Sequence, residues 1–490
     1  MLPSLLVCLT ATIGSSPEVH LREPVYRDLL FPGDQRVILE LSDELAASQK
    51  KYSATWKSAD GKVTKLSTTG DAAKTVTLEV PDLEPGEYEI RFAMGDAVSA
   101  KIRVRKLDQR AASKIAAYVD RHGRLIWKGK PLFVNGWYSD GTIEKLRQIA
   151  DSPFNAVLDY GMTSRSVEET KAYLAEAEKL GVALLMCVND VYPSATYRKK
   201  LGDWVGNDAI LEGVVKAYRD SSAVVLWYNN DEIDAKKRPE LEGYYRLIRE
   251  LDPNHPQLMV HFKKGGLEAF QGAADIFGVD HYPIPKKGPL SVAEHVDWAK
   301  SEIRTGRPTW VVAQNFAWYQ HREIQKPVFE GDRKTTRARL PTPAEWKDGR
   351  PPTREEVRAM TYLSLTHGGQ GLLYWCLYNL DFLPDRAERW RFSCEIAEEV
   401  EELSPVLLEP VGERVEFADP AIHALAKDHK GRRYVIAVNA SDQPLRTSFT
   451  TGSAGSSADV LFEKREVRIS EGKLTDFFPP YGRHVYSLVR

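Results

Sequence analysis

Eight short apolar runs alternate with amphipathic segments between residues 118 and 405. The runs are continuously apolar and rich in β-branched residues, which is typical of parallel strands buried on both faces. Segments such as 167–180, 241–251 and 354–367 repeat apolar residues at helical spacing. Eight strand–helix units predict a closed (β/α)8 TIM barrel, and an open doubly wound sheet is disfavoured because GxGxxG and P-loop motifs are missing. The predicted strands are 132–138, 156–160, 182–190, 223–228, 256–261, 276–283, 309–315 and 371–375.

Alternating apolar and polar residues predict a β-sandwich on each side of the barrel. Residues 22–107 contain period-two segments at 35–41, 75–80 and 87–92, separated by turn residues. The same kind of pattern returns over residues 409–490, so we expect an N-terminal and a C-terminal β-sandwich. A helical linker is predicted over 108–118. The N-terminal sandwich shows no polar cluster, which favours an accessory or packing role over a sugar-binding module, and we expect the C-terminal sandwich to be structural.

Composition excludes several classes of function. The chain has 490 residues, 28% charged and 42% hydrophobic, with a formal net charge of -2, so it has no general attraction to nucleic acid or anionic membranes. Its length predicts several domains. No apolar run is long enough to span a membrane. No cluster of Cys and His predicts a metal, no cofactor is expected, and a homo-oligomer is compatible with the sequence.

The first 16 residues form an apolar run of signal-peptide length that ends in small residues. A basic start is missing, but the run still predicts export to the periplasm or the medium. Cys8 would be removed with this segment, whereas Cys187 and Cys376 lie inside apolar runs, where a thiol behaves as a small hydrophobe.

Polar or aromatic side chains stand at the end of nearly every predicted barrel strand. Because β/α barrels place their chemistry at the carboxyl ends of the strands, these residues predict one concave site. Its amides, carboxylates and rings suit a neutral, polyhydroxylated ligand, that is, a glycan. The long segment 316–352, which includes Trp318, predicts a loop that restricts the site to a terminal sugar. The candidate residues at the strand ends are Asn135, Trp137, Tyr138, Asp159, Asn189, Asn230, Asp231, Glu232, His261, Asp280, Tyr282, Gln314 and Trp375.

Three motifs carry a resemblance to a known group of enzymes. A Trp-x-x-Asn-Asp-Glu block over 227–232, Asp-His-Tyr-Pro over 280–283 and Tyr-Trp at 374–375 resemble clan A of the retaining glycoside hydrolases. The likeness covers residues 118–405 well and the flanking domains loosely. It implies that Glu232 is the general acid/base. In that clan a Glu that ends the seventh strand is the nucleophile, but Gln314 stands there in this chain.

An amide cannot replace the carboxylate nucleophile of the two-carboxylate retaining mechanism. Three explanations follow: a catalytically inactive carbohydrate-binding protein, a nucleophile elsewhere such as Asp280, or a substrate that supplies its own nucleophile. The tandem Asp231-Glu232 resembles the substrate-assisted β-hexosaminidases, which carry an acidic residue beside the acid/base Glu. That resemblance implies that Asp231 orients the 2-acetamido group. Two adjacent carboxylates also disfavour double ionisation, so one pKa is expected to rise.

The sequence therefore predicts a retaining exo-β-N-acetylhexosaminidase, with N-acetylgalactosamine preferred to N-acetylglucosamine through the resemblance alone. A retaining β-galactosidase or β-glucuronidase with another nucleophile is the alternative enzyme. Both carboxylates reach the site only if a bend or bulge at Asn230 breaks the alternation of the strand. Supporting substrate contacts are expected from Gln314 and Tyr282 (acetamido carbonyl and ring substituents), Trp375 and Trp318 (sugar wall), and Asn135, Asp159, Asn189 and Asp280 (hydroxyls). For Gln314 the alternative is a buried hydrogen bond to a neighbouring strand end, and for the tryptophans it is core packing.

Overall fold

A computed structural model describes most of the chain. The described ranges are 19–48, 51–66, 68–71, 74–80, 82–95, 97–191, 200–303, 306–320, 326–330, 333–337, 341–452 and 455–489. The expected signal peptide with Cys8 lies outside them, as do residues 321–325, 331–332 and 338–340 of the predicted loop 316–352. The chain divides into two compact units: residues 1–115 with 119–123 and 304–307, and the remainder of the chain.

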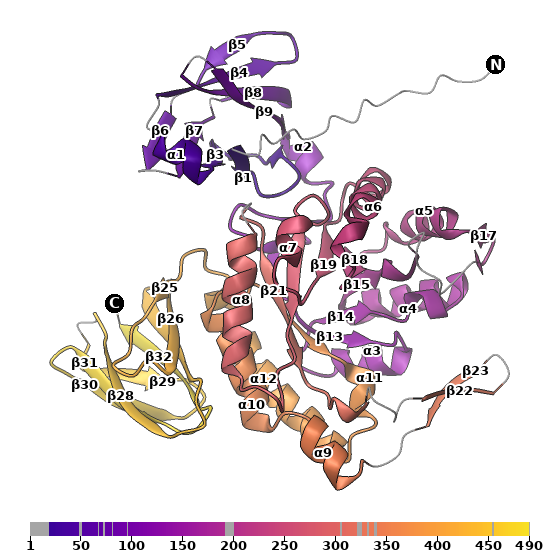
Figure 1. The fold of residues 1–490 in the computed structure, drawn as a ribbon, viewed down its shortest axis with the longest axis vertical. Helices are drawn as coiled ribbons and strands as arrows, with labels where there is room; N and C mark the ends of the chain where they lie inside the picture. Colours follow the sequence, from indigo (N-terminus) through magenta and orange to yellow (C-terminus); the bar gives the residue numbers. More distant parts are fainter. Residues whose placement is uncertain are drawn as a thin grey trace. The chain divides into compact units, whose positions relative to one another are not determined.

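Eight parallel strands close the predicted barrel in the second unit (Figure 1). All eight predicted strands are confirmed, because each predicted run overlaps one barrel strand in the same order. The strands follow each other around the barrel as β13 (Asn135–Ser139), β14 (Ala156–Asp159), β15 (Ala183–Cys187), β18 (Val224–Asp231), β19 (Gln257–Val260), β20 (Ile276–Asp280), β21 (Thr309–Gln314) and β24 (Leu372–Trp375).

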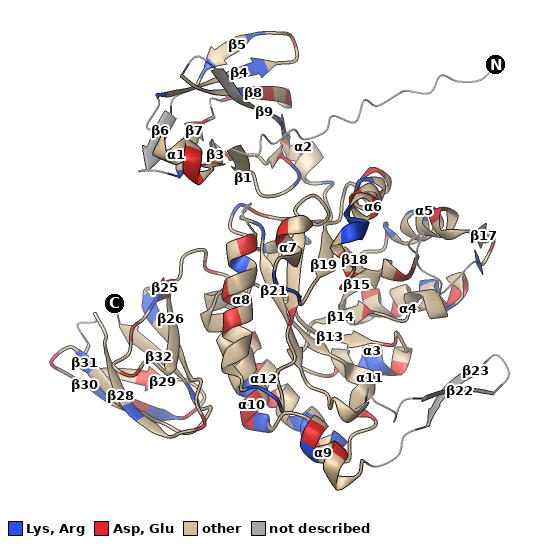
Figure 2. Cartoon of the chain, in the orientation of Figure 1, with Lys and Arg blue, Asp and Glu red and all other residues tan. Residues whose placement is uncertain are grey.

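Amphipathic helices surround this barrel, and Figure 2 shows both basic and acidic residues along them. Helix α4 (Val167–Leu180) illustrates their local signals: Ser166 and Glu169 form a capping box, and Gly181 ends the helix with φ +72°. The other long helices are α3 (Ile143–Ala150), α5 (Asn207–Tyr218), α6 (Arg238–Leu251), α8 (Leu290–Glu302), α10 (Arg354–Thr366) and α12 (Arg386–Leu407). Short helices or 3-10 turns are η1 (Met162–Ser164), η2 (Asn189–Val191), η3 (Ala235–Lys237), α7 (Gly266–Ala269), α9 (Pro343–Gly349) and α11 (Leu377–Leu380). Short hairpins are β16 (Lys200–Leu201) with β17 (Trp204–Val205) and β22 (Lys326–Glu330) with β23 (Arg333–Arg337).

The N-terminal unit is a β-sandwich, as the alternating pattern predicts. Leu39, Trp56 and Phe92 belong to a core shared by its two sheets. Helix α1 (Asp43–Ala47) follows β3. One sheet has the order β1 (Val19–Glu23), β3 (Arg36–Leu41), β7 (Thr75–Glu79) and β6 (Thr68–Asp71); the other has β2 (Leu29–Leu30), β9 (Ala97–Lys106), β8 (Gly86–Met94), β4 (Tyr52–Ser58) and β5 (Val63–Lys65).

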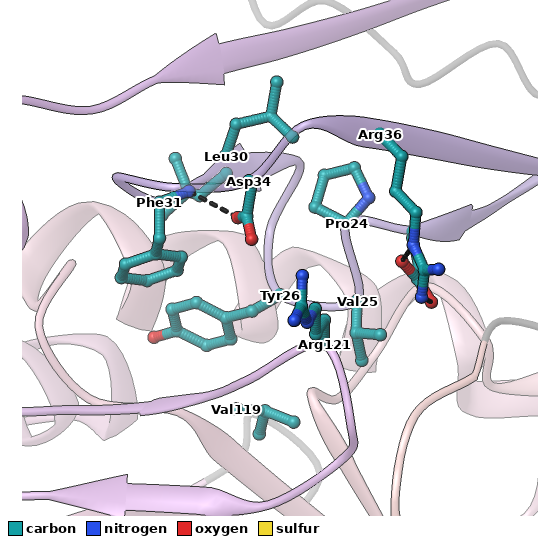
Figure 3. A pocket seen from close by; sticks show the side chains of 11 residues that line it. Pro24, Val25, Tyr26, Leu30, Phe31, Asp34, Arg36, Val119 and Arg121 are labelled. Atoms are coloured by element: carbon teal, nitrogen blue, oxygen red, sulfur yellow. Dashed lines mark hydrogen bonds and ion pairs between the residues drawn. The ribbon is translucent and has the colours of Figure 1, made fainter. Parts of the chain in front are cut away.

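A pocket in this unit is lined by residues 23–26, 29–31, Asp34, Arg36, Val119 and Arg121 (Figure 3). Asp34 accepts a hydrogen bond from the backbone N–H of Phe31 at 2.7 Å, and burial raises the pKa of this carboxyl. Arg36 at the rim is paired with Glu23 at 2.9 Å. The pocket therefore already uses these polar groups for contacts within the unit.

The predicted linker helix is shorter than expected. Helix α2 (Gln109–Ala112) is capped by Asp108, and the chain then enters β10 (Ala117–Val119), which joins β11 (Leu125–Trp127) and β12 (Lys130–Leu132) in one sheet. Strand β10 forms where the helix was predicted to continue, because Ala117 and Val119 are buried. Tertiary packing thus overrides the helix propensity of this segment.

The C-terminal domain is one antiparallel eight-stranded sheet curled around its own core. In sheet order its strands are β25 (Glu413–Arg414), β26 (Ile422–His429), β27 (Arg432–Asn439), β32 (Arg483–Val489), β29 (Ser457–Val460), β30 (Arg465–Ser470), β31 (Lys473–Phe478) and β28 (Leu445–Thr450). Glu399 of α12 joins it to the barrel by pairing with Arg483 at 2.6 Å. Within the described ranges, no helix has the length and apolar character needed to cross a membrane.

Candidate active site

Strand β18 ends in Asp231 and is followed directly by Glu232, and it departs from regular geometry just before these two carboxylates. In its pairing with β19, Tyr228 lies opposite Leu258 and Asn230 lies opposite Met259, so Asn229 is an extra residue. Such a bulge re-aims the side chains that follow it. Glu232 then adopts φ +55°, in the left-handed region. The predicted irregularity is thus present one residue before Asn230, and Asp231 and Glu232 both reach groups on neighbouring strand ends.

Two tyrosine hydroxyls hold the Asp231 carboxyl. Tyr160 donates to Oδ2 at 2.6 Å, and Tyr228 donates to Oδ1 at 2.7 Å. Tyr138 in turn donates to the Tyr228 hydroxyl at 3.2 Å. Burial raises the pKa of Asp231 to about 6, although the two tyrosine hydrogen bonds act in the opposite direction, and the nearby Glu232 charge adds a smaller increase. Asp231 is therefore an oriented anion above about pH 6.

The carboxyl groups of Glu232 and Asp280 lie within hydrogen-bonding range of each other. Asp280 ends β20 and is only 4% exposed, whereas Glu232 is exposed. Burial, followed by the contact with Glu232, raises the pKa of Asp280 well above its ordinary value. Asp280 thus holds a proton more tightly than an ordinary aspartate does, next to the Glu232 carboxyl. Among the described residues, Asp280 Oδ1 has no hydrogen-bond partner.

His261 ends the neighbouring strand, close enough for the Glu232 charge to affect it. Burial lowers the pKa of His261, and Glu232 opposes this effect. A Cβ atom at Gly266 would lie 1.8 Å from the imidazole Cδ2, so only glycine there leaves room for the ring. The site thus has a neutral imidazole beside its exposed carboxyl.

Aromatic side chains surround the carboxyl groups. The ring centroid of Trp375 is 5.0 Å from that of Tyr138 and 5.4 Å from that of Tyr160. The Trp318 indole N–H donates to the backbone carbonyl of Tyr282 at 3.2 Å, with the two rings 6.2 Å apart. Burial raises the pKa of the Tyr282 hydroxyl, and the nearby charges of Asp280, Asp231 and Glu232 raise it further. The predicted Trp375, Tyr138 and Tyr282 are thus brought together around the acids.

Three predicted ligands are not brought to this cluster. Strand β13 begins three residues later than predicted, so Asn135 lies at the amino end of the strand, away from the acids. Trp137 packs among Phe154, Tyr374 and Trp390, with centroid distances of 5.6, 5.1 and 6.2 Å. The Asp159 carboxylate is paired with Arg165 at 2.9 Å. Trp137 packs against Trp390 of α12, and Asp159 is held by Arg165 in the connection after β14, so both side chains are engaged in contacts within the fold.

Three further predicted ligands support the local backbone or its neighbours. Gln314 accepts from the Ile284 N–H at 2.8 Å and donates to the Ile284 carbonyl at 2.9 Å, which matches the alternative stated for it. Asn189 accepts a hydrogen bond from the Cys187 thiol at 2.7 Å and also contacts the Tyr160 hydroxyl. Asn230 accepts from the backbone N–H of Ile233 at 3.3 Å, which shapes the turn after β18.

Sequence reasoning did not assign the tyrosines that hold Asp231. Tyr160 directly follows the second strand, so its position at a strand end was an available signal. Tyr228 precedes Asp231 by three residues and would lie on the opposite face of a regular strand. Only the bulge at Asn229 places both on one side. Tyr378, whose ring lies 6.2 Å from Trp375, follows the eighth strand and gave no comparable signal.

Comparisons with known proteins return structural matches only. No family model and no curated protein matches the chain. The matching solved structures include a family 39 glycoside hydrolase from the gut symbiont Bacteroides cellulosilyticus (13% identity, 96% of this chain and 100% of that chain, TM-score 0.46). A cyclomaltodextrinase (8% identity, 96% and 99%, TM-score 0.49) and an Anoxybacillus α-amylase (10% identity, 71% and 89%, TM-score 0.47) also match. Likeness at this level assigns no activity, so a function has to rest on the site.

Proposed function

We propose that this chain is a retaining glycoside hydrolase that releases terminal β-linked N-acetylhexosamine, with the 2-acetamido group of the substrate as the nucleophile. One observation carries the proposal. Asp231, an anion held by two tyrosines, stands directly beside Glu232, while the seventh strand ends in a Gln314 amide that is bound to the backbone of Ile284.

Asp231 is suited to orient the acetamide. Its two tyrosine donors fix the carboxylate, and its remaining lone pairs can accept the acetamido N–H. A fixed anion also stabilises the positive charge that develops when the acetamido oxygen attacks C1, without reorganisation during the reaction. Trp375 offers an apolar face for the sugar ring.

Glu232 is suited to act as the general acid and base. In the first step the acetamido oxygen forms a bond to C1, the glycosidic C–O bond breaks, and the leaving oxygen takes the proton of Glu232. This gives an oxazolinium ion. In the second step Glu232 takes a proton from water, whose oxygen bonds to C1 while the oxazolinium ring opens and restores the acetamide. The two displacements retain the β configuration.

Asp280 is poorly placed to be a carboxylate nucleophile. Retaining pairs are about 5–5.5 Å apart so that the anomeric carbon fits between them. The Asp280 carboxyl instead lies within hydrogen-bonding range of Glu232, and burial together with this contact raises its pKa well above the ordinary value. It is better suited to keep a proton close to Glu232, and this favours the acetamide as nucleophile over a β-galactosidase or β-glucuronidase mechanism.

We further propose that the enzyme is exported and removes sugars from chain ends. N-acetylgalactosamine is the first terminal sugar to test. A series of nitrophenyl glycosides with N-acetyl, N-fluoroacetyl, N-difluoroacetyl and N-trifluoroacetyl groups tests the mechanism. Fluorine withdraws electrons from the acetamido oxygen, so kcat/KM should fall steeply along the series. Equal rates for all four substrates would contradict participation by the acetamide.

A further inference from the structure

Three consecutive connections at the carboxyl end of the barrel each carry a pair of adjacent lysines. Strands β18, β19 and β20 are neighbours in the barrel, so the connections that follow them lie side by side around the site. We name this group of six residues the lysine rim. Its members are Lys236 and Lys237 after β18, Lys263 and Lys264 after β19, and Lys286 and Lys287 after β20.

The lysine rim is a concentration of positive charge that includes one nearby carboxylate, Asp234. All six side chains are exposed, and within the described part of the chain no acidic group pairs with any of them. Lysines from different connections act on the same groups: Lys236, Lys263 and Lys237 all help to lower the pKa of Asp234 after its backbone hydrogen bond to Lys236. Lys264 and Lys287 both act on His281, whose pKa falls to about 3 mainly through burial and the neighbouring His295.

On the other side of the site, two basic residues that the structure describes are already neutralised. Lys145, which follows β13, is paired with Asp381 at 2.8 Å, and Arg165, which follows β14, is paired with Asp159. The rings of Trp375, Tyr138 and Tyr160 lie at the ends of β24, β13 and β14. Among the described residues, the site thus has an aromatic side on which Lys145 and Arg165 are paired, and a side on which the lysines of the rim form no ion pair.

Glu232 determines which part of the substrate meets the basic side. The general acid must contact the leaving-group oxygen, and Glu232 opens the connection that contains Lys236 and Lys237. Phe262, which is 45% exposed, lies between His261 and Lys263 and offers a ring face in the same region. The terminal sugar therefore belongs on the aromatic side, and the leaving group belongs along the lysine rim.

Resting on the proposed function, we propose that the leaving group is an anionic saccharide, a sugar that carries a sulfate ester or a carboxylate and is bound by the lysine rim. Clustered ammonium groups repel each other, and an anion placed among them removes that repulsion and gains charge-assisted hydrogen bonds. A neutral saccharide would gain neither. Such a field also raises the local concentration of an anionic substrate.

The test compares trisaccharides that share a terminal β-N-acetylhexosamine and differ in the next sugar, which is neutral, sulfated or a uronate. At about 0.02 M salt, where charges are weakly screened, wild-type kcat/KM should be about tenfold or more higher for at least one anionic trisaccharide. The preference should disappear at about 0.5 M salt. K263Q/K264Q and K286Q/K287Q should lose much of it, whereas K171Q/K473Q, a control that removes two exposed lysines elsewhere, should keep it.

The nitrophenyl acetamido glycoside, whose leaving group is not a saccharide, separates the two proposals. The rim variants should cleave it like the wild type. Equal kcat/KM for neutral and anionic trisaccharides, or a preference unchanged in the rim variants, would overturn the anionic leaving group. If the wild type cleaves no acetamido glycoside, the proposed function fails, and calorimetry with the same trisaccharides decides the inference: tighter binding of an anionic one that weakens in the rim variants supports it, and equal binding overturns it.

Discussion

The Tyr160 hydroxyl donates to the Asp231 carboxylate at 2.6 Å, although the two residues are 71 positions apart in the chain. This bond joins the ends of the second and fourth barrel strands and keeps one carboxylate ionised in a buried setting. The electrostatics of the site depend on it, because burial alone would raise the pKa of Asp231 further than it does.

Removal of the Tyr160 hydroxyl should shift the acidic limb of the pH–rate profile. Because this hydrogen bond lowers the pKa of Asp231, Y160F raises that pKa above about 6. Activity requires ionised Asp231, so the acidic limb should move to higher pH by about one unit, the equivalent of about 1.4 kcal/mol for a bond to a charged group. Y173F, a buried tyrosine in α4, is the matched control. An unchanged limb in Y160F would contradict the ionised role of Asp231.

D231N should stabilise the fold while it abolishes activity. In the unfolded chain this carboxyl ionises near its ordinary pKa of 3.8, whereas the folded chain holds the proton until about pH 6. The folded state binds the proton more tightly, so Asp231 costs the wild type stability as the pH rises from about 4 to 6. D231N lacks this ionisation, and its advantage should grow by about 3 kcal/mol across that window.

Urea unfolding at a series of pH values measures this difference. D203N, a change at an exposed carboxyl, is the control. A stability difference between D231N and the wild type that does not change with pH would show that Asp231 has no raised pKa.

D280N should impair proton transfer by Glu232. We do not expect variants of Asp280 to behave as variants of a covalent nucleophile. The raised pKa of Asp280 favours a proton beside Glu232, and an amide has no titratable proton to share. We expect the alkaline limb of kcat to move to lower pH, with a loss of about 10²-fold or more at neutral pH. Added azide should not restore activity to D280G. The formation of an α-glycosyl azide by D280G would identify Asp280 as the nucleophile and contradict the acetamide mechanism.

Q314E tests whether a carboxylate at the end of the seventh strand can act as a nucleophile. A Glu side chain at this position has no N–H to donate to the Ile284 carbonyl. It would place a carboxylate oxygen against that carbonyl oxygen instead. We expect a loss of about 1–3 kcal/mol in unfolding free energy, the usual cost of an unsatisfied buried group. The variant should gain no activity on β-glycosides with a plain 2-hydroxyl. Such a gain would place the Gln314 side chain at the anomeric carbon.

D159N should affect stability rather than substrate binding. Breaking the buried pair with Arg165 leaves an uncompensated guanidinium, which costs about 3–5 kcal/mol. KM at a temperature where the variant is folded should stay close to the wild-type value. A large rise in KM with unchanged unfolding free energy would restore Asp159 as a sugar ligand.

The barrel could be predicted from the sequence because its strands are buried on both faces and leave uninterrupted apolar runs. The same continuous apolar character gives no information on the orientation of individual side chains. Within a continuously apolar strand, no alternation shows that Trp137 contacts the helices while Tyr138 contacts the site. Asn135 was misplaced for a related reason, since the apolar run 132–134 continues into the strand without a boundary.

The candidate acids were accessible to sequence reasoning, whereas their partners were not. Asp231 and Glu232 follow an apolar run directly, so their position at a strand end was readable. Their contacts with Tyr160, Tyr228 and Asp280 depend on the bulge at Asn229 and on the left-handed Glu232. A one-residue change of register has no signature in this sequence. It determines which face every later side chain takes.

The measurement that tests the central claim most directly is hydrolysis of paired nitrophenyl β-glycosides, with and without the 2-acetamido group, by the wild type, D231N and E232Q. We expect cleavage confined to the acetamido sugars and a large loss of activity in both variants. Cleavage of a plain β-galactoside, with D231N nearly as active as the wild type, would contradict it.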